Sequence, residues 1–241
     1  MPSYDHIIQR IIPEIEHHQN RYARGLSALV RPGCQWLDIG AGTRIHDGWV
    51  GVNANEIAGR ADFLVGCDMV GDHLRMNASL QSAVVADAMH LPFSDRSFDL
   101  VTANMVLEHL EAPGEVFAEV TRVLRPGGAF AFVTPNVRNP VVWGASVLLA
   151  KPVRKRLAHL VEGRDEEHIF HTFYRANSRT AIRDLAAEAA LRVEEVDVFN
   201  SYPFIRNLWP LTVIEAIWIK ALSHSPLKSY TTNLFGVLRK P

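Results

Sequence analysis

The sequence has few cysteines and almost no excess of either charge. Two cysteines, Cys34 and Cys67, occur among 241 residues. The sequence has 25 lysines and arginines and 26 aspartates and glutamates, which gives a formal net charge of −1. A chain so balanced has no overall electric field that would recruit nucleic acid or an acidic membrane. Because both cysteines lie in or beside strand-like segments, we expect buried, reduced thiols rather than a disulfide, and a cytoplasmic location.

Long hydrophobic runs are also missing. The first residues lack the basic-then-apolar pattern of a signal peptide. The longest apolar stretch late in the sequence, 209–219, contains Glu215 and is too short to span a bilayer. There is no internal repeat and no low-complexity tract, so a chain with 48% hydrophobic residues is expected to bury one large core.

A glycine turn after a short apolar segment is the most informative feature that is present. Residues 35–39 (Gln-Trp-Leu-Asp-Ile) end at Gly40 and Gly42. The pattern predicts a buried strand followed by a turn whose missing Cβ atoms let a ligand approach the backbone. Taken alone, it also fits dinucleotide-binding enzymes and ordinary tight turns.

Three further signals follow this turn in a fixed order. Residues 63–68 indicate a second strand that ends in Asp68, and residues 84–88 a third that ends in Asp87 and Ala88. Residues 124–128 (Leu-Arg-Pro-Gly-Gly) then open a fifth strand over 129–133. The series closely resembles the class I S-adenosylmethionine-dependent methyltransferases, especially the branch that includes the ubiquinone O-methyltransferases.

The remaining segments fit the fold that this resemblance implies. Strands are expected at 98–102, 193–199 and 234–239, and helices at 7–24, 106–110, 113–124 and 179–190, the last capped by Asn177 or Ser178. Strands that alternate with helices indicate an α/β fold with a largely parallel, doubly wound sheet. The resemblance implies a Rossmann-like sheet of seven strands, in which the last strand runs antiparallel between the fifth and the sixth.

We expect a single methyltransferase domain over 1–241, opened by a helical region at 1–32 and carrying two insertions at 137–175 and 200–232. The first insertion holds an apolar segment (141–150) and a basic cluster, Lys151, Arg154, Lys155 and Arg156. The second carries Trp209, Ile214, Ile217, Trp218 and Leu222. Ligands of open α/β folds sit at the carboxyl end of the sheet, so we interpret the insertions as a helical substrate cap there. The alternative is that they thicken the core.

The resemblance implies that S-adenosyl-L-methionine is held by acids at the ends of the first strands. Asp68, followed by Met69, is expected to accept hydrogen bonds from both ribose hydroxyls, as the corresponding acid does in dinucleotide folds. It lies 30 residues after Asp38, which is more than the roughly 20 of such a unit, so Glu56 stays an alternative. Asp38 is expected to order the glycine turn and to contact the amino acid end of the cofactor.

Asp87 matches the position whose carboxylate, in this family, accepts a hydrogen bond from the adenine amino group. Ala88 and Met89 would contact the ring, and Asn104 lies where backbone groups meet the methionine moiety. The family often has a third glycine where this sequence has Arg44, which either binds the cofactor carboxylate or is a solvated surface side chain. The expected cofactor contacts are Asp38, Gly40, Gly42, Asp68, Met69, Asp87, Ala88, Met89 and Asn104.

Glu108 and His109 are the first catalytic candidates. They resemble the Glu-His pair that follows the fourth strand in this branch, and histidine has an unperturbed pKa near neutrality, as a general base requires. The alternative role for His109 is a structural hydrogen bond at a helix start. Ubiquinone-type enzymes carry a second, metal-associated acid three residues before the glutamate, where this sequence has Met105, so we expect no metal.

A second polar cluster lies between Glu166 and Tyr174. His168 and His171 are three residues apart, which on a helix places both imidazoles on one face, but no third ligand stands at a spacing diagnostic of a metal. We interpret the cluster as a polar lid over the active site, with His171 as a further catalytic candidate. Tyr174 is expected either to hydrogen-bond the substrate or to pack within the cap.

The sequence therefore predicts a methyltransferase with a small-molecule or glycan acceptor, a hydroxyl oxygen as its target, and a place in natural product or glycan biosynthesis. Nucleic acid is disfavoured, because residues 102–105 lack the Asn/Asp-Pro-Pro-aromatic signature of amino-methylating enzymes and the basic cluster lacks interleaved aromatics. One alternative is a lipid or lipid-linked sugar acceptor reached by peripheral membrane contact, and another is a non-catalytic, cofactor-binding partner subunit. The apolar residues of the insertions could equally form a homodimer contact.

Overall fold

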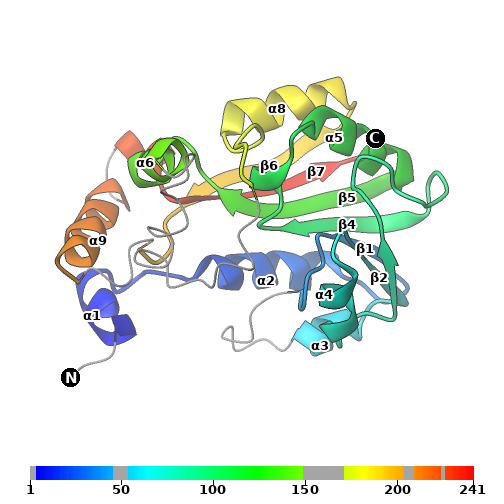
Figure 1. Ribbon diagram of the computed structural model, residues 1–241, viewed down its shortest axis with the longest axis horizontal. Helices are drawn as coiled ribbons and strands as arrows, with labels where there is room; N and C mark the ends of the chain where they lie inside the picture. The colour runs from blue at the N-terminus through cyan, green and yellow to red at the C-terminus, as the bar shows by residue number, and fades with distance from the viewer. Residues whose placement is uncertain (1–3, 46–53, 149–170, 204–208, 224–225) are drawn as a thin grey trace.

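One sheet with helices on both faces organises the molecule (Figure 1). The computed structural model describes residues 4–45, 54–148, 171–203, 209–223 and 226–241. The seven strands lie in the order β3-β2-β1-β4-β5-β7-β6. Their bounds are β1 Gln35–Ile39, β2 Phe63–Asp68, β3 Ser82–Val85, β4 Phe98–Asn104, β5 Leu124–Pro135, β6 Arg192–Phe199 and β7 Asn233–Arg239.

The strand directions confirm the predicted topology. Strands β1 to β5 pair in parallel, and β7 runs antiparallel to both of its neighbours, β5 and β6. Strand β3 is shorter than expected and ends at Val85, so Asp87 lies in the loop that follows it. The parallel arrangement brings the carboxyl ends of β1 to β5 to one edge of the sheet, where the glycine turn also lies.

Alternating side chains fill the core on both faces of the sheet. Phe130 and Phe132 of β5 pack on one face beneath α5 (Pro113–Val123) and α8 (Arg179–Glu188), as Figure 1 shows. Ala131 of the same strand and Trp36 of β1 point to the other face, where α2 (His18–Leu29) covers them. Two short helices connect the first three strands: α3 (Ala54–Ala58) lies between β1 and β2, and α4 (Gly71–Met76) lies between β2 and β3. Because both faces are covered, β5 is apolar without interruption from Ala129 to Val133, which is the sequence signal of a strand buried on both sides.

The prediction of one helix over 7–24 is wrong, because the chain forms two helices there. Helix α1 (Tyr4–Ile11) ends just before Pro13, whose ring disfavours helical backbone in the residue before it and removes a backbone donor. Helix α2 restarts at His18, with the Nδ1 atom of His17 accepting from the amide of Gln19 at 3.3 Å. The break frees α1 to pack against α9 (Trp209–Ser223) rather than against the sheet.

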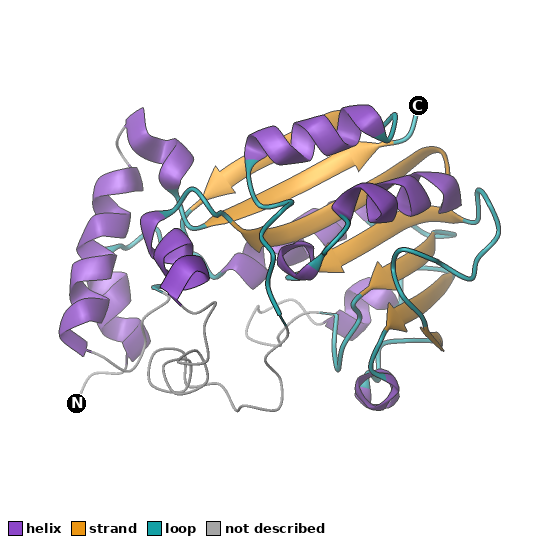
Figure 2. Ribbon diagram, turned by 45° about the horizontal axis from the view of Figure 1, so that its top comes forward, coloured by secondary structure: helices purple, strands orange, loops and turns teal. Residues whose placement is uncertain are grey.

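The two insertions meet at the carboxyl end of β5 (Figures 1 and 2). There α6 (Pro140–Leu148) and the short helix η3 (Pro226–Tyr230) are joined by asparagine side chains. Asn136 donates to the carbonyl oxygens of Ser229 and Thr231 at 3.0 and 2.8 Å, and Asn139 donates to that of Tyr230 at 2.9 Å. The basic cluster at 151–156 lies outside the described residues.

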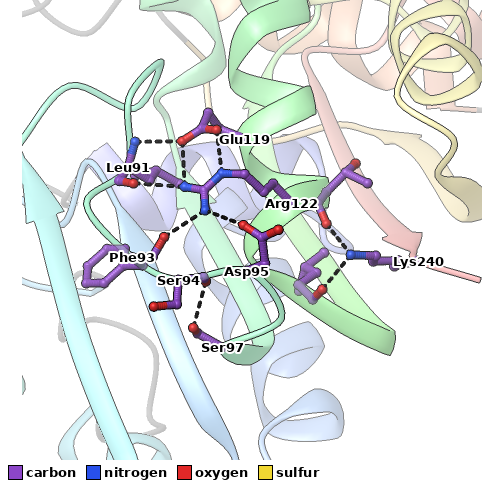
Figure 3. A network of polar contacts seen from close by, with 10 residues as sticks. Leu91, Phe93, Ser94, Asp95, Ser97, Glu119, Arg122 and Lys240 are labelled. Atoms are coloured by element: carbon purple, nitrogen blue, oxygen red, sulfur yellow. Dashed lines mark hydrogen bonds and ion pairs between the residues drawn. The ribbon is translucent and has the colours of Figure 1, made fainter.

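A network around Arg122 fixes the loop that precedes β4 (Figure 3). Its guanidinium donates to the carbonyl oxygens of Leu91 and Phe93 at 2.9 and 2.7 Å, and pairs with Glu119 and Asp95. Glu119 in turn accepts from the amide of Leu91 at 2.8 Å. The C-terminal turn of α5 thereby holds residues 91–95, which follow the loop that carries Asp87.

Candidate functional site

Three aspartates gather at the carboxyl edge of the sheet. Asp38 and Asp68 stand at the ends of the adjacent strands β1 and β2, and Asp87 follows β3. Cys67 lies among them. Burial, together with the charges of Asp68, Asp87 and Asp38, raises the pKa of its thiol to about 12. The structure therefore brings together the three acids on which the sequence prediction of a cofactor site depends.

Asp68 holds the glycine turn through its carboxylate. One oxygen accepts from the amide of Gly42 at 2.9 Å and the other from the amide of Val70 at 2.8 Å. Gly40 and Gly42 have φ values of +65° and +47°, a conformation that glycine adopts without steric cost. A Cβ atom on Gly40 would lie 2.4 Å from a methyl group of Val106, whereas one on Gly42 would meet nothing closer than 3.9 Å. The space beside Gly42 is therefore open.

Asp38 is buried on the face of the sheet that α2 covers. Its carboxylate accepts from the hydroxyl of Thr102 at 2.5 Å, and that hydroxyl accepts from the indole nitrogen of Trp36 at 2.7 Å. Burial raises the pKa of Asp38 from 3.8 to about 7; the hydrogen bond from Thr102 opposes this shift and the charge of Asp68 adds to it. Asp38 thus carries a proton more readily than an exposed aspartate does.

The loop after β3 places Asp87 half-buried beside the other two acids. Its carboxylate accepts from the amide of Met89 at 2.9 Å, and Ala88 and Met89 pack against the hydrophobic core. Met69, directly after Asp68, is 72% exposed. The alternative acid Glu56 is exposed on α3, where it pairs with Arg60 at 3.7 Å. Of the two candidates for the second acid, the structure places Asp68 against the glycine turn.

Asn104 ends β4 next to this site. Its side chain exchanges two hydrogen bonds with that of Gln19 on α2, at 3.1 and 2.9 Å, and donates to the carbonyl of Ile45 at 2.9 Å. Met105 follows with a φ of +56°, an unusual conformation for a residue with a side chain. Such backbone outliers often mark functional sites. The expected contact of Asn104 with the cofactor stays a prediction.

His109 lies where the backbone fixes its tautomer. Its Nδ1 atom is 2.8 Å from the carbonyl oxygen of His171. Because a carbonyl only accepts hydrogen bonds, the proton of a neutral ring lies on Nδ1 and the lone pair on Nε2. Both the catalytic and the structural hypotheses for His109 are therefore compatible, since the structural hydrogen bond leaves Nε2 basic.

Glu108 is buried and hydrogen-bonded to the end of β5. Its carboxylate accepts from the hydroxyl of Thr134 at 2.9 Å, and its exposed fraction is 4%. Its backbone carbonyl accepts from the amides of Phe173 and Tyr174 at 2.7 and 3.1 Å. The structure thus gives Glu108 the geometry of a positioning residue, which ties the segment beginning at His171 to the end of β4.

His171 and Tyr174 flank that segment. The exposed ring of His171 packs against that of Phe173 at a tilt of 44°, with 4.5 Å between ring centroids, and Tyr174 has a φ of +54°. His171 therefore reaches His109 through its backbone oxygen and not through its imidazole. His168 lies outside the described residues. Within the ranges that the structure describes, no group of three histidine, cysteine or acidic side chains could hold a metal ion.

Sequence reasoning missed three polar residues that support the site. Gln19 orients Asn104, Thr102 binds Asp38, and Asn77 donates to the carbonyl of Ala41 in the glycine turn at 2.9 Å. Thr102 had a usable signal, because a hydroxyl inside an apolar strand needs a partner when it is buried. Gln19 and Asn77 had none, since their partners are distant in the sequence.

Comparisons with known proteins agree with this geometry. Residues 37–132 match the sequence model of a family described as a methyltransferase domain. The demethylmenaquinone methyltransferase of Corynebacterium glutamicum is 36% identical over 112 residues, which cover 45% of this chain and 46% of that protein. A sterol 24-C-methyltransferase of Gibberella zeae is 32% identical over 128 residues, 48% of this chain and 31% of that protein. The chain spans about half the length, or less, of the curated relatives it matches.

Solved structures share the whole fold at low sequence identity. A putative methyltransferase from Bacillus halodurans has a TM-score of 0.58 at 20% identity, covering 92% of this chain and 98% of that one. A geranyl diphosphate methyltransferase in complex with S-adenosylmethionine has a TM-score of 0.56 at 19% identity, covering 100% and 93%. Residues 37–132 are thus similar to a methyltransferase domain, and the chain shares the fold of these solved structures.

Proposed function

We propose that this protein transfers a methyl group from S-adenosylmethionine to a hydroxyl oxygen of a small-molecule acceptor. The observation that carries the proposal is the meeting of Asp38, Asp68 and Asp87 with an open glycine turn at one edge of the sheet. His109 lies at the end of β4, one strand away from Asp38. A cofactor site and a candidate base thus share the carboxyl edge of the sheet.

The residues present fit the cofactor. A side chain at Gly42 would project into open space, so glycine there leaves room beside Asp68 for a ligand. Asp68 would hold the ribose hydroxyls, Asp87 the adenine amino group, and Ala88 and Met89 the faces of the ring. When bound, S-adenosylmethionine supplies an activated methyl group on a sulfonium, so the protein has mainly to hold and orient the reactants.

His109 is the proposed general base for the acceptor hydroxyl. The carbonyl of His171 holds the ring by Nδ1, which turns the basic Nε2 to the opposite side of the imidazole. Glu108 keeps this arrangement in place, because its backbone carbonyl binds Phe173 and Tyr174 while its carboxylate is anchored on Thr134. Proton transfer to a positioned imidazole is worth about 10²- to 10⁴-fold in rate.

The acceptor is proposed to be a small molecule because the relatives are named for a demethylmenaquinone and a sterol; both compounds are lipids, so the same names support a lipid acceptor as well. A glycan acceptor belongs to the same proposal. A lipid or lipid-linked sugar is the second candidate, and it is favoured by the large apolar side chains that α6 and α9 expose. The identity of the acceptor can be tested by incubating the protein with labelled S-adenosylmethionine and acceptors of each class.

Cofactor binding gives the sharpest test of the site. Calorimetry should show S-adenosylhomocysteine binding at micromolar level, about −8 kcal/mol. Asp68→Ala should weaken binding by about 10²-fold, because the partner of two hydroxyl groups is lost. Glu56→Ala is the matched control, since this exposed acid was the alternative, and it should bind normally.

Two results would contradict the assignment. Binding of NAD without binding of S-adenosylhomocysteine would exclude the cofactor. Normal cofactor binding without turnover on any class of acceptor would favour a non-catalytic, cofactor-binding subunit instead.

A further inference from the structure

Helix α9 has apolar residues on two opposite sides. One side is buried and includes Ala216, Ile219 and Leu222, which lie toward α1 and the core. At 3.6 residues per turn, the opposite side carries Leu211, Ile214, Ile217 and Trp218. A surface helix normally turns polar residues to water. The outer side of α9 therefore differs from an ordinary solvated helix face.

We name this outer side, together with Trp209, the α9 face. Its residues expose 44% of Trp209, 46% of Leu211, 63% of Ile214, 57% of Ile217 and 40% of Trp218. On α6, the other described helix of the two insertions, Trp143 is 58% exposed. Three of the five tryptophans of the chain are thus large exposed side chains of these two helices. Gathered exposed apolar groups of this size mark an interaction surface.

In the described residues of the two insertions, the exposed charged side chains are all basic. Arg138, Lys220 and Lys228 are exposed, whereas Glu215, the one acid within the described residues of 136–148 and 209–232, is 4% exposed. The basic cluster of Lys151, Arg154, Lys155 and Arg156 begins three residues after α6 ends, outside the described residues. Acids follow this cluster in the same segment, at Glu162, Asp165, Glu166 and Glu167, so the described cations of this surface are Arg138, Lys220 and Lys228.

We propose that the α9 face docks on an anionic lipid bilayer, with the helix lying in the interface. Tryptophan and aliphatic side chains flanked by lysine and arginine are the composition of interfacial helices, and tryptophan is enriched at the depth of the headgroups. None of the helices in the described ranges is long and apolar enough to cross a membrane, so docking is peripheral. A protein partner would have to supply an acidic, apolar surface, which a bilayer with anionic lipids provides by itself.

Docking would also orient the methyltransferase domain. Helices α6 and α9 lie beyond the carboxyl end of β5, on the side of the sheet to which the parallel strands point (Figures 1 and 2). The acceptor would then be drawn from the bilayer or its surface. This consequence for the acceptor rests on the proposed function, whereas the docking itself does not.

Vesicle flotation of the full chain tests the docking without cofactor or acceptor, so it can fail independently of the proposed function. We expect binding to phosphatidylcholine vesicles that contain phosphatidylglycerol, and much weaker binding to phosphatidylcholine alone. Tryptophan emission should shift to shorter wavelength on anionic vesicles, because exposed indoles leave water. High salt should reduce binding, since part of the attraction is electrostatic.

Two sets of variants separate the apolar and the charged contributions. Ile214→Asp with Ile217→Asp should lower the partition coefficient at least tenfold, whereas Met76→Asp, an equally exposed apolar site on α4, should not change it. Lys220→Gln and Lys228→Gln should each lower binding to anionic vesicles about fivefold at low salt. The lysine variants remove no packing, so they keep the proposal testable if the isoleucine variant is unstable.

Three outcomes would overturn the proposal. The first is the absence of binding to anionic vesicles. The second is binding that neither the isoleucine nor the lysine variants weaken. The third is a stable dimer in light scattering that Ile214→Asp dissociates, which would assign the α9 face to a second copy of the chain.

Discussion

At the scale of single residues, Asp38 is the titrating group with the clearest consequence. Burial raises its pKa from 3.8 to about 7 in the folded protein. Between these values the folded state holds a proton that the unfolded chain has released. The group therefore contributes stability in full below about pH 3.8, and this contribution is lost as the pH rises toward about 7.

Asp38→Asn should remove this titration. The melting temperature of the variant, relative to the wild-type protein, should rise as the pH increases from about 4 to about 7, because only the wild-type protein loses stability there. Scanning fluorimetry of both cofactor-free proteins across this range measures the difference. A difference that stays constant with pH would show that Asp38 ionises normally.

His109 carries the prediction about catalysis. His109→Ala should lower kcat by about 10²-fold or more on a hydroxyl acceptor, with S-adenosylhomocysteine affinity kept. His171→Ala is the matched control, because His171 binds His109 through a backbone oxygen that alanine retains. Full activity in the first variant and loss in the second would move the base to His171. Activity in both would mean catalysis by positioning alone.

At the scale of elements, the contacts of Arg122 join α5 to the loop before β4 (Figure 3). Hydrogen bonds to Glu119 and Asp95 raise the pKa of Arg122, and the guanidinium lowers the pKa of Glu119. The arginine also satisfies two backbone carbonyls, which separates this network from an ordinary surface ion pair.

Arg122→Met should lower the free energy of unfolding by about 1–2 kcal/mol, because two carbonyls and Glu119 lose their donor. Arg75→Met provides the control: Arg75 pairs with Asp72, and both side chains are more than two thirds exposed, at 74% and 81%. Loss of that pair should lower the free energy of unfolding by less than about 0.5 kcal/mol. Thermal or urea unfolding of the three proteins checks the contrast, and equal losses would contradict it.

The elements that sequence predicted well are those set by local pattern. The strands before Gly40 and Asp68, the start of α5 at Pro113 and the cap of α8 by Ser178 all follow from residues close in sequence. Helix α1 was not separated from α2, although Pro13 gave the signal. Its packing against α9, almost the whole chain away, had no local signal at all.

The candidate site likewise has features that sequence patterns predict and features that depend on how distant segments pack. The three acids could be predicted because parallel strands bring their carboxyl ends together. The burial of Glu108 against Thr134 could not, since it depends on how the loop after β4 packs on β5. The contact of His109 with the backbone of His171 joins residues 62 apart and has no sequence pattern.

At the scale of the whole molecule, the net charge does not show how the charged side chains are distributed over the surface. A net charge of −1 excludes a strong overall field, and peripheral membrane contact was predicted only as an alternative, from the apolar insertions and the basic cluster at 151–156. The fold collects exposed cations around α6, α9 and η3, while Glu215 is buried there. Exposed cations can therefore lie together on one surface of a protein whose net charge is close to zero.

The strand order also has a consequence for synthesis. Strands β5 and β6 both pair with β7 and not with each other, although β7 is the last of the three in the chain. While the ribosome is extending the chain, β6 has no strand to pair with and β5 has an open edge until residues 233–239 emerge. Open edges of apolar strands are prone to aggregate, and pairings between distant segments form slowly. The time between the synthesis of β5 and that of β7 is therefore the period in which this edge is exposed to wrong pairing.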